Sequence, residues 1–111
     1  NCMTTLYGLK NCDTCKKALK AMEGVGKDVH FVDIRAEADL PSLVPTWLEA
    51  AGSDLLINRR STTWRGLSDA EREADPVALL AANATLIKRP VIEAGDAIHV
   101  GWANDVQAAL L

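Results

Sequence analysis

Two cysteines lie three residues apart in the motif Cys12-Asp13-Thr14-Cys15, where a β-prone run gives way to a helical pattern. The start of a helix carries unpaired N–H groups and the positive end of the helix dipole, so it stabilises a thiolate over a thiol. Such a position commonly lowers a cysteine pKa from about 8.5 to between about 3.5 and 7.5. The spacing puts both sulfurs on one side of the helix. The motif therefore predicts thiol–disulfide chemistry in which Cys12 attacks and Cys15 resolves the mixed disulfide.

Positive charge is concentrated around this motif, in Lys10, Lys16 and Lys17. Lysines in the first turn of a helix oppose the helix dipole, so helix propensity alone does not favour them there. They do favour an anion at Cys12. We therefore expect these lysines to help lower the Cys12 pKa.

Three other interpretations of the cysteines fit the sequence less well. A structural zinc site needs four ligands, but the chain has one Cys-x-x-Cys pair, and His30 and His99 stand at no familiar ligand spacing. A structural disulfide across so short a loop would remove little entropy from the unfolded chain. Two packed, inert cysteines would explain a random pair, but their place in a βαβ unit favours redox chemistry. We expect no metal, and we assign no function to Cys2.

Length and charge narrow the classes of function. The 111 residues suit a single domain with one hydrophobic core. The net charge of −3 argues against a broad electrostatic grip on nucleic acid, so we expect no direct DNA binding. No apolar run approaches the roughly 20 residues that span a bilayer, and no secretion signal is visible, so we expect no membrane association. With an odd number of cysteines, these features predict a cytoplasmic protein.

The first third of the chain has the pattern of a βαβ unit. Residues 4–9 are β-prone, and an apolar stripe of Ala18, Leu19, Met22 and Val25 then predicts a helix. Residues 29–34 are almost continuously apolar, which favours a strand covered on both faces over an edge strand. Two parallel strands joined by a helix place the cysteines at a strand-to-helix turn.

The middle of the chain has a helical pattern. Asp39 is a candidate N-cap ahead of an apolar stripe in which Trp47 is a core residue. Ser68 and Glu71 have the spacing of a capping box and begin a second helical segment. Asp75, directly before a proline, begins a third.

The last part of the chain changes period again. Residues 90–93 and 97–100 predict a β-hairpin, and residues 103–111 predict a helix. The element order is therefore β-α-β, a helical block, then β-β-α. We predict a single domain over residues 3–111 with a helical insertion at residues 36–84.

Three separated motifs carry a resemblance to a known family. They are Tyr7-Gly8 with Asn11-Cys12-Asp13-Thr14-Cys15-Lys16-Lys17, then Leu55-Leu56-Ile57-Asn58-Arg59-Arg60-Ser61-Thr62-Thr63-Trp64-Arg65, and finally Leu86-Ile87-Lys88-Arg89-Pro90. In these motifs and their order the chain resembles the ArsC/Spx/YffB family of arsenate reductase-like proteins. The resemblance extends from Thr4 to about Val106, and the Thr-Thr-Trp-Arg run is closest to the YffB branch.

The resemblance implies an α/β, thioredoxin-like fold with a mixed four-stranded sheet and a helical insertion. It implies that Cys12 is the attacking thiol and that Pro90 is a cis-proline facing it. Family arginines that surround the thiol correspond to Arg89 and to Arg60, with Arg59 as a rival. The resemblance further implies that Asn11, Thr14, Arg59, Arg60 and Pro90 contribute to substrate binding.

One position departs from the family pattern. A third arginine is expected near Gly101, where this chain has Val100-Gly101-Trp102. Arsenate is multiply negative, and an oxyanion site that lacks one strong donor typically loses a factor of about 10² to 10³ in rate. We therefore expect arsenate reduction to be weak or absent.

The resemblance implies a function as a thiol-dependent reductase that uses glutathione or glutaredoxin on a small anionic or disulfide substrate. Glutathione would be a co-substrate, and no tightly bound cofactor is expected. Arginine suits this role because its planar fork pairs with carboxylates and oxyanions. The alternative is a redox-sensing transcription regulator like the Spx relatives, in which the disulfide is a switch and the partner is RNA polymerase.

Overall fold

The computed structural model describes residues 4–111. Cys2 and the predicted start of the domain at residue 3 lie outside this range. The chain divides into two compact units. We call residues 4–38 with Arg89–Leu111 the sheet unit, and Asp39–Lys88 the helical unit. The prediction of a single domain over residues 3–111 with an insertion at residues 36–84 stays a prediction.

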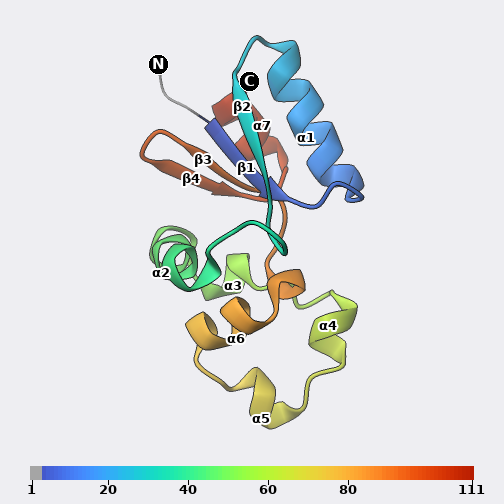
Figure 1. Ribbon diagram of the computed structural model, residues 1–111, viewed down its shortest axis with the longest axis vertical. Helices are drawn as coiled ribbons and strands as arrows, with labels where there is room; N and C mark the ends of the chain where they lie inside the picture. Colours follow the sequence, from blue (N-terminus) through green and yellow to red (C-terminus); the bar gives the residue numbers. More distant parts are fainter. Residues whose placement is uncertain (1–3) are drawn as a thin grey trace. The chain divides into compact units, whose positions relative to one another are not determined.

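The sheet unit consists of four strands and two helices (Figure 1). They are β1 (Thr4–Gly8), α1 (Asp13–Gly24), β2 (Val29–Asp33), β3 (Val91–Ala94), β4 (Ala97–Val100) and α7 (Asn104–Leu110). The strand order is β2-β1-β3-β4, with β1 parallel to β2 and the other neighbouring pairs antiparallel. The mixed four-stranded sheet predicted from the sequence is confirmed.

Both helices of the sheet unit cover the same face of the sheet. Leu6 of β1 and Ile92 of β3 are directly paired and fully buried. Apolar residues from both helices pack around them, namely Cys15, Ala18, Met22, Val106 and Leu110. The buried apolar residues of α1 hold the helix against the sheet, and this packing sets the orientation of its first turn.

Two sequence predictions in this unit are wrong. Strand β2 lies at an edge of the sheet, although its apolar run favoured a strand covered on both faces. Its residues are half-buried, and His30 is exposed. Strand order depends on pairing between distant segments, which a local apolar run does not encode. Val25 follows the last residue of α1 and is 53% exposed, so it does not extend the apolar stripe.

The helical unit consists of short helices around its own core. They are α2 (Leu40–Ala51), α3 (Ser53–Leu56), α4 (Thr62–Arg65), α5 (Asp69–Arg72), α6 (Pro76–Ala82) and the 3₁₀ turn η1 (Ala84–Leu86). Its fully buried side chains are Val44, Trp47, Leu56, Leu80, Leu86 and Ile87. Trp47 is therefore a core residue, as predicted.

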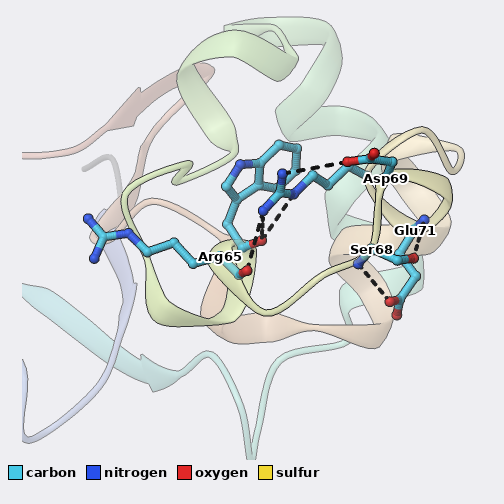
Figure 2. Close-up of polar contacts among 6 residues, drawn as sticks. Arg65, Ser68, Asp69 and Glu71 are labelled. Carbon is cyan, nitrogen blue, oxygen red and sulfur yellow. Dashed lines mark hydrogen bonds and ion pairs between the residues drawn. The ribbon is translucent and has the colours of Figure 1, made fainter.

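Caps fix the ends of the short helices. The predicted capping box is present: Ser68 Oγ accepts from the Glu71 N–H at 3.2 Å, and a Glu71 carboxylate oxygen accepts from the Ser68 N–H at 2.9 Å (Figure 2). Asp75 likewise accepts from the Ala78 N–H at 3.3 Å. Asp39 stands at the N-cap of α2, but its side chain makes no capping hydrogen bond, so that part of the prediction is wrong.

Within residues 4–111, no helix combines the length and the hydropathy needed to cross a membrane.

Candidate active site at the thiol turn

Cys12 stands at the N-cap of α1, in a segment that we call the thiol turn (residues 9–16). Its N–H donates to the Leu9 carbonyl at 3.1 Å, and its own carbonyl accepts from the Lys16 N–H at 3.0 Å. Its backbone is extended, as is usual for an N-cap residue. The side chain is half-buried, so the sulfur is accessible from solvent.

Cys15 is enclosed by the sheet unit and is 0% exposed. A Cβ built on Gly8 would lie 2.5 Å from the Cys15 sulfur, a distance that atoms of this size do not reach. Gly8 ends β1, so the missing side chain there makes the space into which the sulfur fits. The sequence signal for this role is a glycine at the end of a strand, which marks close approach of another group.

Burial raises the pKa of the Cys15 thiol to about 12. A backbone hydrogen bond from Leu9 opposes this effect, while the side-chain hydrogen bond with Cys12 and the charge on Cys12 reinforce it. Cys15 is therefore protonated near neutral pH.

The pKa of Cys12 is shifted in the opposite direction. Burial alone would raise it, and hydrogen bonds from the backbone and the side chain of Cys15 oppose that effect. The Arg89 guanidinium adds a hydrogen bond and a favourable charge. Together these groups lower the pKa of the Cys12 thiol below its ordinary value.

This source of charge differs from the one that the sequence indicated. Lys10, Lys16 and Lys17 are all exposed, and none is among the groups that shift the Cys12 pKa. A contribution of these lysines to the thiolate stays a prediction. The cation beside Cys12 is Arg89, which comes from a segment more than 70 residues away in the sequence.

Arg89 has hydrogen-bonding capacity to spare. Its Nε and Nη1 atoms are buried, and within residues 4–111 neither has a hydrogen-bond partner. The following peptide bond, between Arg89 and Pro90, is cis, as the resemblance implies. Pro90 is fully buried, and its carbonyl accepts from the Gly101 N–H at 2.8 Å. Buried donors without partners are unfavourable, so these two N–H groups are well suited to an incoming anion.

The remaining candidates in the sheet unit are less constrained. Asn11 and Thr14 are exposed in the thiol turn, and their contact with a substrate stays a prediction. At the position of the third family arginine, Gly101 adopts a φ of +85°, and Trp102 packs against the core. No group of three or more His, Cys, Asp or Glu side chains within residues 4–111 is arranged to hold a metal ion.

Arg59 and Arg60 belong to the helical unit, in what we call the arginine loop (residues 58–65). Arg59 forms a salt bridge of 3.3 Å with Asp54, and its guanidinium lies 5.4 Å from the centre of the Trp64 ring. Arg60 is exposed, and its N–H donates to Asn58 Oδ1 at 3.1 Å. Whether either arginine faces Cys12 stays a prediction.

Both arginines line a cavity of about 490 Å³ within the helical unit. Its other lining residues are Asp54, Leu55, Ile57, Asn58 and Lys88. Three cations against one acid give this cavity a positive balance. It could therefore hold an anionic group.

Comparisons with known proteins agree with this architecture. A protein of Haemophilus influenzae of uncharacterised function is 42% identical over 113 residues, covering 96% of this chain and 98% of the relative. The solved structure of the YffB (PA3664) protein is 34% identical, with a TM-score of 0.87 over 97% of this chain and 98% of that one. An arsenate reductase (ArsC) related protein from Brucella melitensis is 33% identical, with a TM-score of 0.75 over 96% and 92% of the two chains.

A fourth likeness concerns the fold alone. Glutaredoxin (grx-1) from Archaeoglobus fulgidus is 16% identical, with a TM-score of 0.51 over 96% of this chain and 83% of that one. The thioredoxin-like fold is thereby confirmed. The family model described as the ArsC family matches residues 7–110, which include the thiol turn, the arginine loop and the Arg89–Pro90 peptide. The chain therefore belongs to the ArsC family and is arsenate reductase-like.

Proposed function

We propose that this protein is a thiol-dependent reductase in which Cys12 is the nucleophile and Cys15 is the resolving thiol. The observation that carries the proposal is that the pKa values of two neighbouring thiols are shifted in opposite directions. Cys12 is accessible and has a lowered pKa, while Cys15 is fully buried and has a pKa raised to about 12. A pair built only for packing would not need one thiol stabilised as an anion by the other.

The reaction that fits this pair has two displacement steps. The Cys12 thiolate attacks one sulfur of a disulfide substrate, forms a mixed disulfide with it and expels the other half as a thiolate. Cys15 then gives up its proton and attacks the Cys12 sulfur. This second step forms the internal disulfide and releases the remaining half of the substrate as a thiol or thiolate.

Two molecules of glutathione, or a glutaredoxin, would return the internal disulfide to thiols. We place this cycle in the cytoplasm, where glutathione keeps thiols reduced. The likeness to a glutaredoxin concerns the fold and does not identify the donor.

Arg89 is the group that we propose to hold an anionic part of the substrate beside Cys12. Its two unpartnered, buried donors support this role, because they would gain hydrogen bonds only when a ligand is present. For a second cation, Arg60 is the better candidate. Arg59 already pairs with Asp54 and lies over Trp64, whereas the Arg60 side chain has no such partner within the described residues. Arsenate should be a poor substrate, because Trp102 contributes no charge.

Turnover assays with a small disulfide and with arsenate, each with glutathione and glutaredoxin, test this proposal. We expect disulfide turnover in the wild type and a loss of about a thousandfold or more in Cys12→Ser, because the nucleophile is removed. Cys15→Ser should accumulate a mixed disulfide on Cys12, visible by mass spectrometry. Formation of the internal disulfide without any turnover would contradict a reductase and favour a redox switch.

A further inference from the structure

A second cavity, of about 310 Å³, lies in the sheet unit beside the thiol turn. Three apolar side chains, those of Leu9, Leu19 and Phe31, line it together with Lys10 and Lys16. Its lining includes neither cysteine nor Arg89, so it is distinct from the groups that set the chemistry at Cys12. Its volume is at the lower end of the range for small-molecule sites.

The cavity adjoins the nucleophile on the same face of α1. Lys16 and Leu19 stand four and seven residues after Cys12, which places all three on one stripe of the helix. Side chains on a helix lean toward its N-terminus, so the Lys16 side chain leans toward the turn at which Cys12 stands, and Leu19 lies one turn further along. Leu9 follows strand β1, and its carbonyl accepts a hydrogen bond from the Cys12 N–H, so this lining residue also lies next to Cys12.

The lining defines the chemistry of an occupant. The apolar side chains favour a hydrocarbon body, and the two lysines favour an anionic end. Within residues 4–111 no salt bridge engages either lysine. Lys10 lies near Asp33. The pKa of Asp33 is lowered mainly by backbone hydrogen bonds from Ala36 and Arg35, and the charge on Lys10 adds a smaller effect. Asp13 stands three residues before Lys16 on α1, but no ion pair joins the two side chains in the described part of the chain.

We propose that this cavity is the subsite for the organic group attached to the sulfur that Cys12 attacks, and that it selects a small aliphatic or aromatic thiol carrying a carboxylate. The proposal rests on the reductase function above and specifies its substrate class. In the mixed disulfide, the hydrocarbon part occupies the space between Leu9, Leu19 and Phe31. The carboxylate then lies at the lysines, and attack by Cys15 releases the carboxylate-bearing thiol. Glutathione is a tripeptide with polar amide groups, and it suits this apolar lining less well.

Rates of reaction with a matched series of small disulfides test the charge preference. Dithiodipropionate, hydroxyethyl disulfide and cystamine carry anionic, neutral and cationic groups. Each rate constant is expressed per Cys12 thiolate, so that changes in pKa cancel. Lys16→Gln should slow dithiodipropionate by about twofold to fivefold relative to hydroxyethyl disulfide, in line with an exposed ion pair.

Lys17→Gln is the matched control, because Lys17 is exposed on the same helix but does not line the cavity. Lys17→Gln should slow dithiodipropionate less than Lys16→Gln does, because it removes one positive charge from the helix but none from the cavity. Equal effects of the two substitutions on dithiodipropionate would overturn the proposed role of Lys16.

The apolar part is tested by lengthening the substrate from dithiodiglycolate to dithiodipropionate and dithiodibutyrate. Each added methylene should speed the reaction by up to about threefold to fourfold if the cavity buries it. Leu19→Ala should flatten this dependence, so that the rate ratio of dithiodibutyrate to dithiodiglycolate falls toward one. A rate independent of chain length in the wild type would overturn the proposal.

A binding measurement separates this inference from the reductase proposal. In Cys12→Ser, which lacks the nucleophile, phenylbutyrate should perturb the amide NMR signals of Leu9, Leu19 and Phe31, and Lys16→Gln in that background should weaken the effect. Perturbations confined to other residues would refute the cavity as a carboxylate subsite, whether or not the wild type reduces disulfides. Binding in Cys12→Ser with no disulfide turnover in the wild type would instead refute the reductase proposal alone.

Discussion

The thiol turn and the arginine loop are both among the motifs by which the chain resembles the ArsC family. They differ in whether the buried or charged groups beside them have hydrogen-bond or ion-pair partners. In the arginine loop they find partners nearby: Arg59 pairs with Asp54, and the Ser61 hydroxyl accepts from the Trp64 N–H. Beside the thiol turn, two buried donors of Arg89 have no partner within the described residues.

A residue outside the loop, Arg72, satisfies two of the loop's carbonyl groups, as the dashed lines in Figure 2 mark. The Arg72 guanidinium lies 5.2 Å from the centre of the Trp64 ring and donates to the Trp64 carbonyl at 3.0 and 3.2 Å and to the Arg65 carbonyl at 3.3 Å. Such groups stabilise the fold that contains them. A polar group left unpaired at a reactive thiol has no such structural role, and it is therefore the better guide to where a ligand binds.

The largest effect on this comparison is expected from Gly8→Ala. The new Cβ would lie 2.5 Å from the Cys15 sulfur, so the buried thiol must move. Overpacking of this kind typically lowers the free energy of unfolding by about 1–3 kcal/mol. Denaturant unfolding measures that loss, and the yield of the Cys12–Cys15 disulfide after mild oxidation should fall with it.

Two controls isolate the contact. Gly24→Ala is a matched substitution, because nothing lies within 4 Å of a Cβ at Gly24, and it should not destabilise the protein. In a Cys15→Ala background, Gly8→Ala should cost less, although contacts of 3.1 Å with Cys15 Cβ and 3.3 Å with Leu6 remain. An equal cost in both backgrounds would show that the sulfur is not what Gly8 accommodates.

Arg89→Ala should change reactivity and leave stability almost intact. The free energy of unfolding should change by less than about 1 kcal/mol, because the two buried donors make no hydrogen bond that could be lost. The pKa of Cys12 should rise, since Arg89 is one of the groups that lower it. Alkylation of Cys12 should therefore slow at pH values below the variant's pKa and converge on the wild-type rate above it.

Arg89→Lys keeps the charge but not the planar fork, so its alkylation profile should lie between those of the wild type and Arg89→Ala. If Arg89→Ala and the wild type gave the same pH profile, the guanidinium would not stabilise the thiolate, and the contrast between the two regions would lose its basis.

Arg59→Ala should have the smallest effect, and it should be on stability. The salt bridge joins side chains that are 44% and 97% exposed, and such pairs contribute about 0.2–1 kcal/mol. The contact with Trp64 adds about 0.5–1 kcal/mol at most. Melting temperatures at low and high salt measure the change, with Arg60→Ala as the control that lacks both contacts. Unchanged stability with slower turnover would instead make Arg59 the site arginine.

Much of this molecule follows from local sequence patterns. The strand-to-helix turn at Cys12, the capping box at Ser68 and the burial of Trp47 all depend on residues close together in the chain. Local geometry determines them, so periodicity and capping rules are sufficient.

What the sequence did not predict depends on contacts between distant segments. The cation that helps to lower the Cys12 pKa, after the hydrogen bonds from Cys15, is Arg89, which the sheet brings close from a distant segment. The edge position of β2 has the same origin, because strand order follows from tertiary pairing. Only the resemblance to a family pointed to Arg89, since no local pattern connects residues 12 and 89.

The full burial of Cys15 also determines how the proposed internal disulfide can be opened. Since an attacking sulfur must approach in line with the S–S bond, an external thiol can reach the Cys12 sulfur and not the Cys15 sulfur. Cys15 is then always the leaving group, whichever donor attacks. In the reduced protein this thiol has a pKa of about 12, which marks it as a poor leaving group. We therefore expect recycling of the oxidised protein to be faster when a proton can be delivered to Cys15 as it leaves.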